Sequence, residues 1–283
     1  MKNGLKRKLI QIAAFGFTNS RLGNFAAGKI YQGKWKNFCA PGMNCYSCPA
    51  ATFACPIGSM QSIAAGRRTN FSFYVVGLIL AFGVLLGRAV CGFLCPFGLL
   101  QELLYLIKTP KLKLKKIFTY VKYVILLLFV MILPVVVVDM TGLGSPWFCE
   151  YICPVGTLEA GVPLLLADKV LRSAIGPLFY MKFGIMIAVI ILCVLIYRFF
   201  CKVLCPLGAI YGLLNKISLL HLRCDKSKCN ECGLCKEACL MDVDPAKESR
   251  SAECILCGRC THACNRGALK LTMKPEAMEK KDG

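Results

Sequence analysis

The sequence predicts a mainly α-helical integral membrane bundle with re-entrant half-helices, followed by a small C-terminal α+β domain. Three observations predict this fold class. The 283-residue chain is 57% hydrophobic with a mean hydropathy of +0.59, which is too apolar for an ordinary soluble domain. It contains three apolar segments of membrane length. Most of its 20 cysteines stand in short spacings typical of metal ligands, beside these segments, and not in the pattern of a disulfide framework.

Residues 1–68 form the first predicted unit, an N-terminal segment that bears cysteines. Its beginning is basic, but no small-residue cleavage site follows the apolar stretch, so we expect no removable signal peptide. Residues 9–20 are apolar but shorter than a span, and extending them to Gly28 would place Arg21 inside the bilayer. We therefore expect an interfacial or re-entrant helix here, with a fourth span as the alternative.

Residues 69–218 form the second predicted unit, the transmembrane domain. Three of its segments read as spans: Thr69–Gly87, Ile117–Val138 and Ser173–Tyr197. Pro134 predicts a kink in the second span. Lys122 and Lys182 lie near enough to span ends for their ammonium groups to snorkel toward the interface.

The basic residues predict the orientation of these spans. The loop between the first two spans is the most basic one, with Arg88, Lys108, Lys111, Lys113, Lys115 and Lys116. The positive-inside rule places this loop in the cytoplasm, together with the C-terminal domain, and places residues 39–55 and 149–153 at the outer face of the cell membrane. The formal charge of +20 thus reflects topology, and we expect no nucleic acid partner, because the basic residues gather at the ends of apolar segments.

A weak internal repeat follows the predicted spans. Each span is followed by a C-x3-C-P-x-G motif, and the paired cysteines are Cys91 and Cys95, Cys149 and Cys153, and Cys201 and Cys205. A degenerate copy precedes the first span, with Ala51 in place of the first cysteine but with Cys45 and Cys48 just upstream of Cys55. An apolar stretch of about three helical turns follows each motif, so we expect a ligand loop and then a re-entrant half-helix that begins at the proline.

Paired C-x3-C motifs predict iron–sulfur clusters within the membrane domain. A C-x3-C pair places two thiolates one helical turn apart, and two facing pairs supply the four ligands of one [4Fe–4S] cubane. The topology assigns one inner cluster to Cys91, Cys95, Cys201 and Cys205. It offers six cysteines for an outer cluster: Cys149, Cys153, Cys39, Cys45, Cys48 and Cys55. The surplus pair, which can include Cys39, is left as a disulfide or as part of a further cluster. Cys193 stands alone in its span and is expected to be a buried free thiol.

Eight further cysteines lie in the third unit, the C-terminal domain of residues 219–272. They form two C-x2-C-x2-C-x3-C quartets, the ligand spacing of a two-cluster ferredoxin, which disfavours the alternative of two zinc sites. Because the fourth cysteine of each quartet reaches the other cluster, we expect two ligand sets: Cys229, Cys232, Cys235 and Cys264, and Cys254, Cys257, Cys260 and Cys239. Leu240 and Asn265 replace the proline that usually follows the fourth cysteine, and Cys224 is either a spare thiol or an unusual ligand. Residues 273–283 are expected to form a disordered polar tail.

Other cofactor signatures are missing from the sequence. Two histidines and no CxxCH motif argue against haem, and no GxGxxG or Walker loop indicates a nucleotide. With its CGFLCPFGLLQ and CKVLCPLGAIYG motifs and the double quartet, the chain resembles the membrane polyferredoxins of the NapH, NosR and CcoG type over roughly residues 70 to 270. This resemblance implies a multi-pass electron-transfer subunit that links quinol or flavin partners to iron–sulfur carriers. The chain departs from the family in its third motif, at Cys149, and in lacking the flavin-binding extracytoplasmic domain of the NosR branch.

The leading functional hypothesis is an electron conduit in the cytoplasmic membrane. Electrons would pass between the cytoplasmic ferredoxin-type domain, which meets a ferredoxin or flavoprotein, and an outer partner such as a flavoprotein, a quinone or a reductase. Two alternatives use the same four clusters. The chain would then be a membrane redox sensor or metallocentre-assembly factor, or a quinone-reactive oxidoreductase in its own right.

Overall fold

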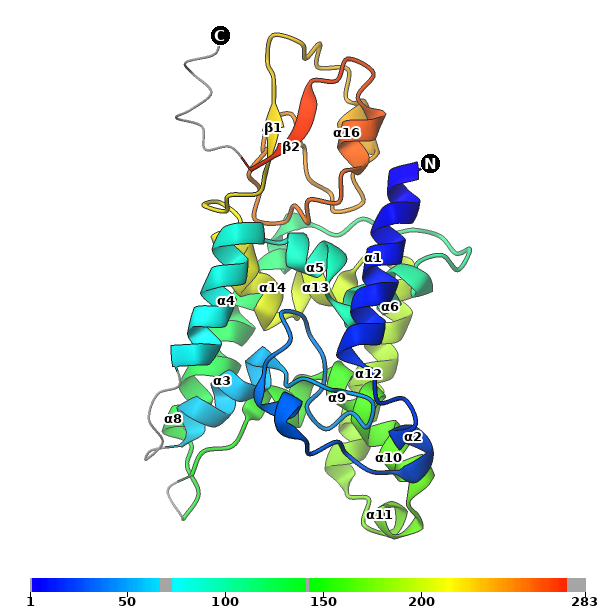
Figure 1. Ribbon diagram of the computed structural model, residues 1–283, viewed down its shortest axis with the longest axis vertical. Coiled ribbons are helices and arrows are strands. Elements are labelled where there is room, and N and C mark those ends of the chain that lie inside the picture. The colour runs from blue at the N-terminus through cyan, green and yellow to red at the C-terminus, as the bar shows by residue number, and fades with distance from the viewer. Residues whose placement is uncertain (1, 67–72, 141–142, 274–283) are drawn as a thin grey trace.

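A computed structural model describes residues 2–66, 73–140 and 143–273 as an elongated, mainly helical bundle with a small domain at one end (Figure 1). The first four residues of the predicted first span and almost all of the predicted tail lie outside the described residues. Four long helical segments run along the bundle: α1 (Lys2–Thr18), α4 (Phe73–Leu86), the segment Lys116–Val136 and α12 (Pro177–Leu195). Within the described residues, Lys116–Val136 and α12 are long and apolar enough to cross a membrane.

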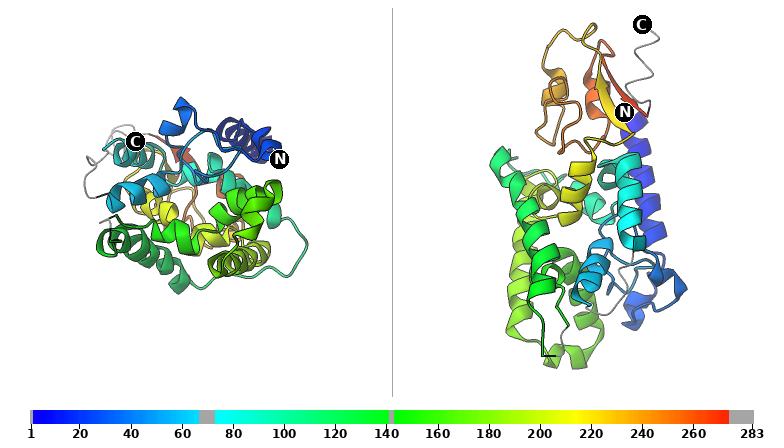
Figure 2. Two further views of the ribbon diagram at one scale, coloured as in Figure 1. Left: turned by 90° about the horizontal axis from the view of Figure 1, so that it is seen from below. Right: turned by 90° about the vertical axis from the view of Figure 1, so that its left-hand side faces the viewer.

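The four long segments alternate in direction. The N-terminus of α1 and the ends of α4 and α12 lie toward the small domain, as both side views show (Figures 1 and 2). The segment Lys116–Val136 runs away from the small domain, antiparallel to α4 and α12 (Figure 2). It comprises η2 (Lys116–Tyr120), α7 (Val121–Ile125), the π-helical η3 (Leu126–Ile132) and α8 (Leu133–Val136). The widened η3 turn directly precedes Pro134, which has no N–H to donate to the helical ladder.

The expected half-helices are present after the CP motifs. They are α3 (Pro56–Ala65), α6 (Pro96–Leu104), α14 (Pro206–Leu214) and the series α9 (Pro154–Gly156), η5 (Thr157–Gly161) and α10 (Val162–Ala167). Each begins at the motif's proline, with the preceding cysteine as the N-cap residue. The first cysteines of the complete motifs lie on α5 (Ala89–Phe93), η4 (Phe148–Ile152) and α13 (Phe199–Val203). Short helices α2 (Asn24–Ala27), η1 (Lys34–Asn37) and α11 (Lys169–Ser173) complete the bundle.

The C-terminal domain contains a two-stranded antiparallel sheet and two short helices. Strand β1 (His221–Cys224) pairs with β2 (Leu269–Thr272), so that Cys224 lies opposite Leu269. The helices are α15 (Leu234–Glu237) and α16 (Arg259–Ala263), each about one turn long. The sheet brings the two ends of the domain together, and the cysteine-rich segments between them fold over the bundle end (Figure 1).

Helix α1 exposes apolar side chains and buries polar ones, the opposite of a helix on the surface of a soluble protein. Leu9 and Ile12 of α1 are each 56% exposed, whereas Arg7 and Gln11 of the same helix are buried. Arg7 donates hydrogen bonds to the Glu102 carboxylate at 2.7 and 2.8 Å. This helix was expected over residues 9–20; it begins earlier and packs along α5 and α6, with its charge neutralised inside the bundle.

Candidate functional site

The structure gathers most of the predicted ligand cysteines into four sets, two in the C-terminal domain and two in the bundle. All 20 cysteines are free thiols, so none of the surplus outer cysteines forms a disulfide. Within the described residues, no group of three or more His, Cys, Asp or Glu side chains could hold a single metal ion. The four thiolates of a cubane bind different irons at its corners, so a cluster needs a wider thiol set than a single ion does.

Two thiol sets lie in the C-terminal domain. The first set lines a cavity of about 390 Å³ and consists of Cys229, Cys232, Cys235 and Cys264, with Cys224 beside them. The second set lines a smaller cavity and consists of Cys239, Cys254, Cys257 and Cys260. The fourth cysteine of each quartet thus lies with the other quartet, in the crossed arrangement that the spacing predicts. Burial and the neighbouring thiols raise the pKa of Cys254 to about 11 and that of Cys260 to about 12.

The inner set joins two CxxxCP motifs that are far apart in the sequence. Cys91 and Cys95 from α5 and α6 lie against Cys201 and Cys205 from α13 and α14, close enough for their thiolate charges to interact. Each of the four side chains is at most 6% exposed. The arrangement is compact, buried and supplied by two facing pairs, which suits one cubane.

The outer set uses the degenerate motif in place of a complete one. Cys149 and Cys153 lie against Cys45 and Cys55, again within range of mutual charge interaction. These four thiols line a cavity of about 740 Å³. The cysteine that is absent at position 51 is therefore replaced in space by Cys45, which the N-terminal loop brings back to the site.

Two of the six outer cysteines lie beside this set. The Cys39 thiol lines the same cavity but donates to the Ser59 hydroxyl at 3.4 Å. Cys48 is buried next to the Lys36 ammonium, within range of its charge. The structure thus places Cys39 and Cys48 beside the outer set, and their role as cluster ligands stays a prediction.

The glycines of the two inner CP-x-G motifs, Gly98 and Gly208, have a steric role. At the second of them, the Gly208 N–H also donates to the Cys205 thiol at 3.3 Å. A Cβ atom at Gly98 would lie 2.9 Å from the Cys91 carbonyl oxygen. At these two motifs, glycine therefore lets the half-helix begin close to the carbonyl of the motif's first cysteine.

Two fully buried arginines each donate a hydrogen bond to the backbone of the other inner motif. Arg88 and Arg198 each stand three residues before the first cysteine of their own motif. Arg88 donates to the Cys201 carbonyl at 3.1 Å, and Arg198 donates to the Cys91 carbonyl at 2.5 Å. We expected both arginines only to close a span, although the repeated R-x-x-C spacing carries the signal for this reciprocal contact.

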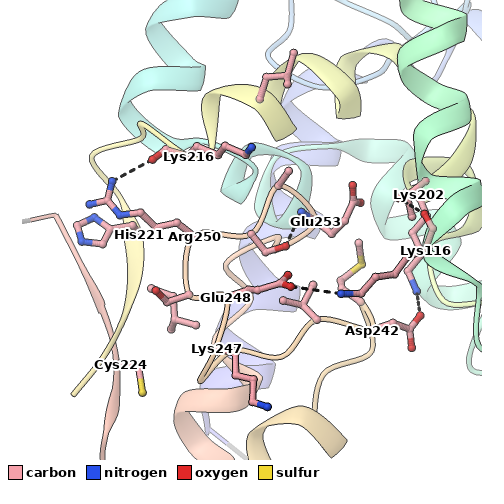
Figure 3. Close-up of a pocket in the computed structure, with 18 of the residues that line it drawn as sticks. Lys116, Lys202, Lys216, His221, Cys224, Asp242, Lys247, Glu248, Arg250 and Glu253 are labelled. Carbon is pink, nitrogen blue, oxygen red and sulfur yellow. Dashed lines mark hydrogen bonds and ion pairs between the residues drawn. The ribbon is translucent and has the colours of Figure 1, made fainter. Parts of the chain in front are cut away.

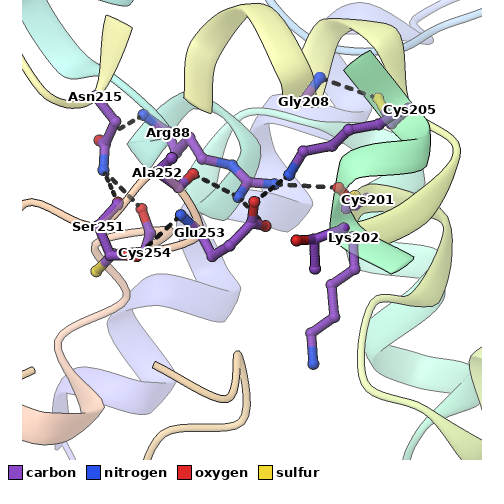
Figure 4. Close-up of polar contacts among 12 residues, drawn as sticks. Arg88, Cys201, Lys202, Cys205, Gly208, Asn215, Ser251, Ala252, Glu253 and Cys254 are labelled. Carbon is purple, nitrogen blue, oxygen red and sulfur yellow. Dashed lines mark hydrogen bonds and ion pairs between the residues drawn. The ribbon is translucent and has the colours of Figure 1, made fainter. Parts of the chain in front are cut away.

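Arg88 also holds the C-terminal domain onto the inner set (Figure 4). It donates to the Ala252 carbonyl and to the Glu253 carboxylate, both at 2.7 Å. Lys122 forms a second ion pair with Glu253 and is fully buried, so the expectation that it snorkels is wrong. The Asn215 side chain donates to the carbonyls of Ser251 and Cys254 at 2.8 and 3.2 Å.

The loop around residues 252–255 of the C-terminal domain meets α5 and α14 of the bundle, and we call this contact the seam. Two glycines allow the two backbones to approach each other closely there. A Cβ atom at Gly92 would lie 2.6 Å from the Ile255 carbonyl oxygen, and one at Gly212 would lie 3.0 Å from the Ala252 oxygen. The loop that carries Cys254 therefore rests directly on α5 and α14. The second C-terminal thiol set thus adjoins the inner set.

A polar cavity of about 960 Å³ lies beside the seam (Figure 3). Basic residues outnumber acidic ones in its lining, which includes Lys116, Lys202, Lys216, Lys226 and Lys247. Lys202 donates to Asp242 at 2.6 Å, and Lys116 forms a longer, exposed pair with Glu248 at 3.4 Å. The lysine-rich loop after α6 therefore lies at the same end of the bundle as the C-terminal domain.

Comparison with known proteins agrees with this site. The 4Fe-4S binding domain family matches residues 71–116, 126–171 and 178–223. Each matched segment contains most of one predicted span and one CxxxCP motif, which confirms the internal repeat.

Relatives among characterised and uncharacterised proteins cover most of the chain. An uncharacterized protein of Methanocaldococcus jannaschii is 29% identical over 209 residues, 70% of this chain and 69% of its own length. The ferredoxin-type protein NapH of Escherichia coli is 24% identical over 239 residues, 77% of this chain and 74% of its own. The methylamine utilization ferredoxin-type protein MauN of Paracoccus denitrificans is 26% identical over 209 residues, 71% and 66% of the two chains. No solved structure is significantly similar. The chain thus carries three matches to the 4Fe-4S binding domain and is related to ferredoxin-type electron transport proteins.

Proposed function

We propose that this protein is a membrane-embedded electron conduit with four [4Fe–4S] clusters. The observation that carries the proposal is the order of the thiol sets. The first and second sets lie in the C-terminal domain, the inner set lies directly beneath the seam, and the outer set lies deeper in the bundle near α3 and α9 (Figure 1). Four carriers in this order form a path from one end of the molecule toward the other.

The bundle suits a bilayer because its outward faces are apolar. Leu80 on α4, Leu127 in the segment Lys116–Val136 and Ile191 on α12 are 47 to 61% exposed, while Arg88 and Arg198 are fully buried. An exposed apolar surface of this kind marks contact with lipid or protein, and charged groups inside a membrane protein face the bundle interior. We infer at least three passes, with α1 as a fourth element along the bundle.

The positive-inside rule orients the molecule. The lysine-rich loop and the C-terminal domain share one end of the bundle, so placing the loop in the cytoplasm by this rule places the domain there too. Within residues 1–68, the cysteine-bearing part at 39–55 then lies at the outer side, while residues 69–218 act as the membrane domain and residues 219–272 as the cytoplasmic ferredoxin domain (Figure 1).

The thiols of each set would hold one cluster, which accepts or donates one electron when bound. The ligands would be Cys229, Cys232, Cys235 and Cys264; Cys239, Cys254, Cys257 and Cys260; Cys91, Cys95, Cys201 and Cys205; and Cys45, Cys55, Cys149 and Cys153. The surrounding chain buries the four thiols of the inner site and fixes the spacing between sites. A ferredoxin or flavoprotein would meet the cytoplasmic domain, where Cys232 is exposed.

Metal analysis tests this proposal. Four cubanes contain about 16 Fe per chain with a matching amount of acid-labile sulfide. Anaerobically purified protein should approach these values and show the paramagnetic signals of several reduced clusters. Stoichiometric zinc with little sulfide would contradict the proposal.

A quinone-reactive site at the outer set is a second candidate. The outer cavity extends beyond the four thiols to Ser59, Tyr74 and Phe179, so it offers apolar walls and hydroxyl groups beside the proposed cluster. Its volume also has to accommodate that cluster. Turnover of a lipid-soluble quinone by the purified protein with a reductant tests this candidate, and an absence of turnover would leave the protein partners.

A further inference from the structure

Each bundle site contains one buried glutamine whose side chain contacts one of the thiols of that site. Gln61 on α3 and Gln101 on α6 each stand six residues after the CP cysteine of their motif, and both are 0% exposed. The Gln61 amide donates to Cys149 Sγ at 3.2 Å, and the Gln101 amide donates to Cys201 Sγ at 3.1 Å. In both cases the sulfur belongs to the first cysteine of the facing CxxxCP motif.

The remaining contacts fix the orientation of each amide. The second N–H donates to the carbonyl one helical turn back, on Ile57 at 3.3 Å for Gln61 and on Phe97 at 3.4 Å for Gln101. The oxygen of Gln61 accepts the Phe148 N–H at 2.9 Å. Rotating this amide by 180° would place its oxygen against a carbonyl and its NH₂ against an N–H, so the donor must face the sulfur.

The inner amide is held in the same way. The Gln101 oxygen accepts the Cys201 N–H at 3.4 Å, and the Cys193 thiol donates to it at 3.6 Å. Cys193, which has no place among the proposed ligands, therefore supports the orientation of Gln101.

The other two motifs do not repeat this contact. The equivalent positions hold Glu159, whose carboxylate accepts the Cys45 N–H at 2.9 Å, and Tyr211, whose hydroxyl donates to the Pro41 carbonyl at 2.9 Å. The same glutamine donor thus serves each bundle site, always from the N-terminal partner of the two facing motifs.

We propose that Gln61 and Gln101 are a matched pair of positioning residues that raise the reduction potentials of the outer and inner clusters. This inference rests on the proposed function. Reduction adds negative charge to a cluster and its thiolates, and an N–H dipole aimed at a thiolate sulfur stabilises the reduced form more than the oxidised form. The effect is strong at a buried site, where water does not screen it.

Equal donors at the two sites raise both potentials by similar amounts, so these contacts add no potential step between the sites. One electron passes between the sites, so that one site is oxidised as the other is reduced, and the two donors favour neither direction of transfer.

Redox titration of three variants tests this inference. Gln101→Met removes the donor with little change in side-chain size, and we expect the electron affinity of one bundle cluster to fall about tenfold, or about 59 mV for one electron. Gln61→Met should shift a different signal by a similar amount. Gln11→Met is the matched control, because the buried Gln11 amide donates to the Gly92 carbonyl at 2.9 Å and not to a sulfur. Its potentials should equal those of the wild type.

A second measurement uses the wild type, so it tests the inference even where a glutamine variant loses a cluster. Wild-type protein with ¹⁵N in its glutamine side chains should show nitrogen hyperfine coupling to both reduced bundle clusters in pulsed paramagnetic resonance. The inference would be overturned if both glutamine variants kept intact clusters with unshifted potentials. It would also be overturned if the intact clusters of the wild type showed no such coupling. Either result would leave the proposed conduit unaffected. Bundle sites without iron would instead overturn the proposed function.

Discussion

Neutralising one carboxylate should loosen the C-terminal domain from the bundle. Glu253 forms ion pairs with Arg88 and Lys122, and both cations are fully buried. Glu253→Gln preserves the shape of the side chain but leaves the two buried cations without a counter-charge. Burial acts to raise the pKa of Glu253, yet the two cations lower it below its ordinary value, so the carboxylate is ionised at neutral pH.

The structure sets the expected size of this effect. Removing one partner of a buried ion pair costs about 3–5 kcal/mol. Arg88 retains the carbonyls of Ala252 and Cys201 as acceptors, so we expect the lower end, about 3 kcal/mol. Since about 1.4 kcal/mol corresponds to a factor of ten, the undocked fraction should rise roughly 10²-fold.

Hydrogen–deuterium exchange on the cluster-loaded protein measures this docking. The amides of residues 251–255 should exchange roughly 10²-fold faster in Glu253→Gln, because that loop rests on the bundle. Glu248→Gln is the matched control, since its pair with Lys116 is 3.4 Å long and both side chains are more than half exposed. Such a pair contributes at most about 1 kcal/mol. Equal exchange in the two variants would refute the reasoning.

Three further predictions follow from the arrangement of thiols. Cys193→Ser should leave the iron content unchanged whereas Cys95→Ser should remove or convert one cluster, and equal iron loss in both would show that ligands and spare thiols have been mis-sorted. A reporter fused after Asp168 should signal the outer side of the membrane; a cytoplasmic signal there would exclude a two-sided conduit. Cys91→Ala combined with Cys201→Ala should leave the C-terminal clusters reducible by a membrane-impermeant cytoplasmic donor but block reduction of the outer cluster in freeze-quench paramagnetic resonance. Undiminished outer reduction would instead favour the sensor or assembly-factor hypothesis.

Local sequence patterns predicted the features that depend on neighbouring residues. Apolar length predicted Lys116–Val136 and α12 to within a few residues, and the CP motif predicted where the half-helices begin. Spacing in the quartets also predicts that Cys239 and Cys264 lie with the other quartet, and each of them lines the cavity of that quartet. Each of these signals is read from a continuous stretch of chain, so no tertiary information was needed.

The features that escaped prediction depend on contacts between distant segments. Lys122 lies near a span end, where snorkelling is the usual solution, but Glu253 from another domain neutralises it inside the protein. Arg7 is stabilised in the same way by Glu102, 95 residues away. The position of Cys45 beside Cys149 and Cys153 likewise depends on how the N-terminal loop folds back, which spacing alone does not determine.

The two seam glycines have a consequence for the speed of the proposed conduit. Electron tunnelling slows exponentially as the gap between donor and acceptor widens, and every other amino acid would add a Cβ at Gly92 or Gly212. At Gly92 that atom would meet a backbone oxygen at 2.6 Å, so neither side could yield without lifting the domain. The separation between the second C-terminal set and the inner set is therefore limited by two missing methyl groups, and a substitution at either glycine that leaves every ligand and charge in place would still slow electron transfer between them.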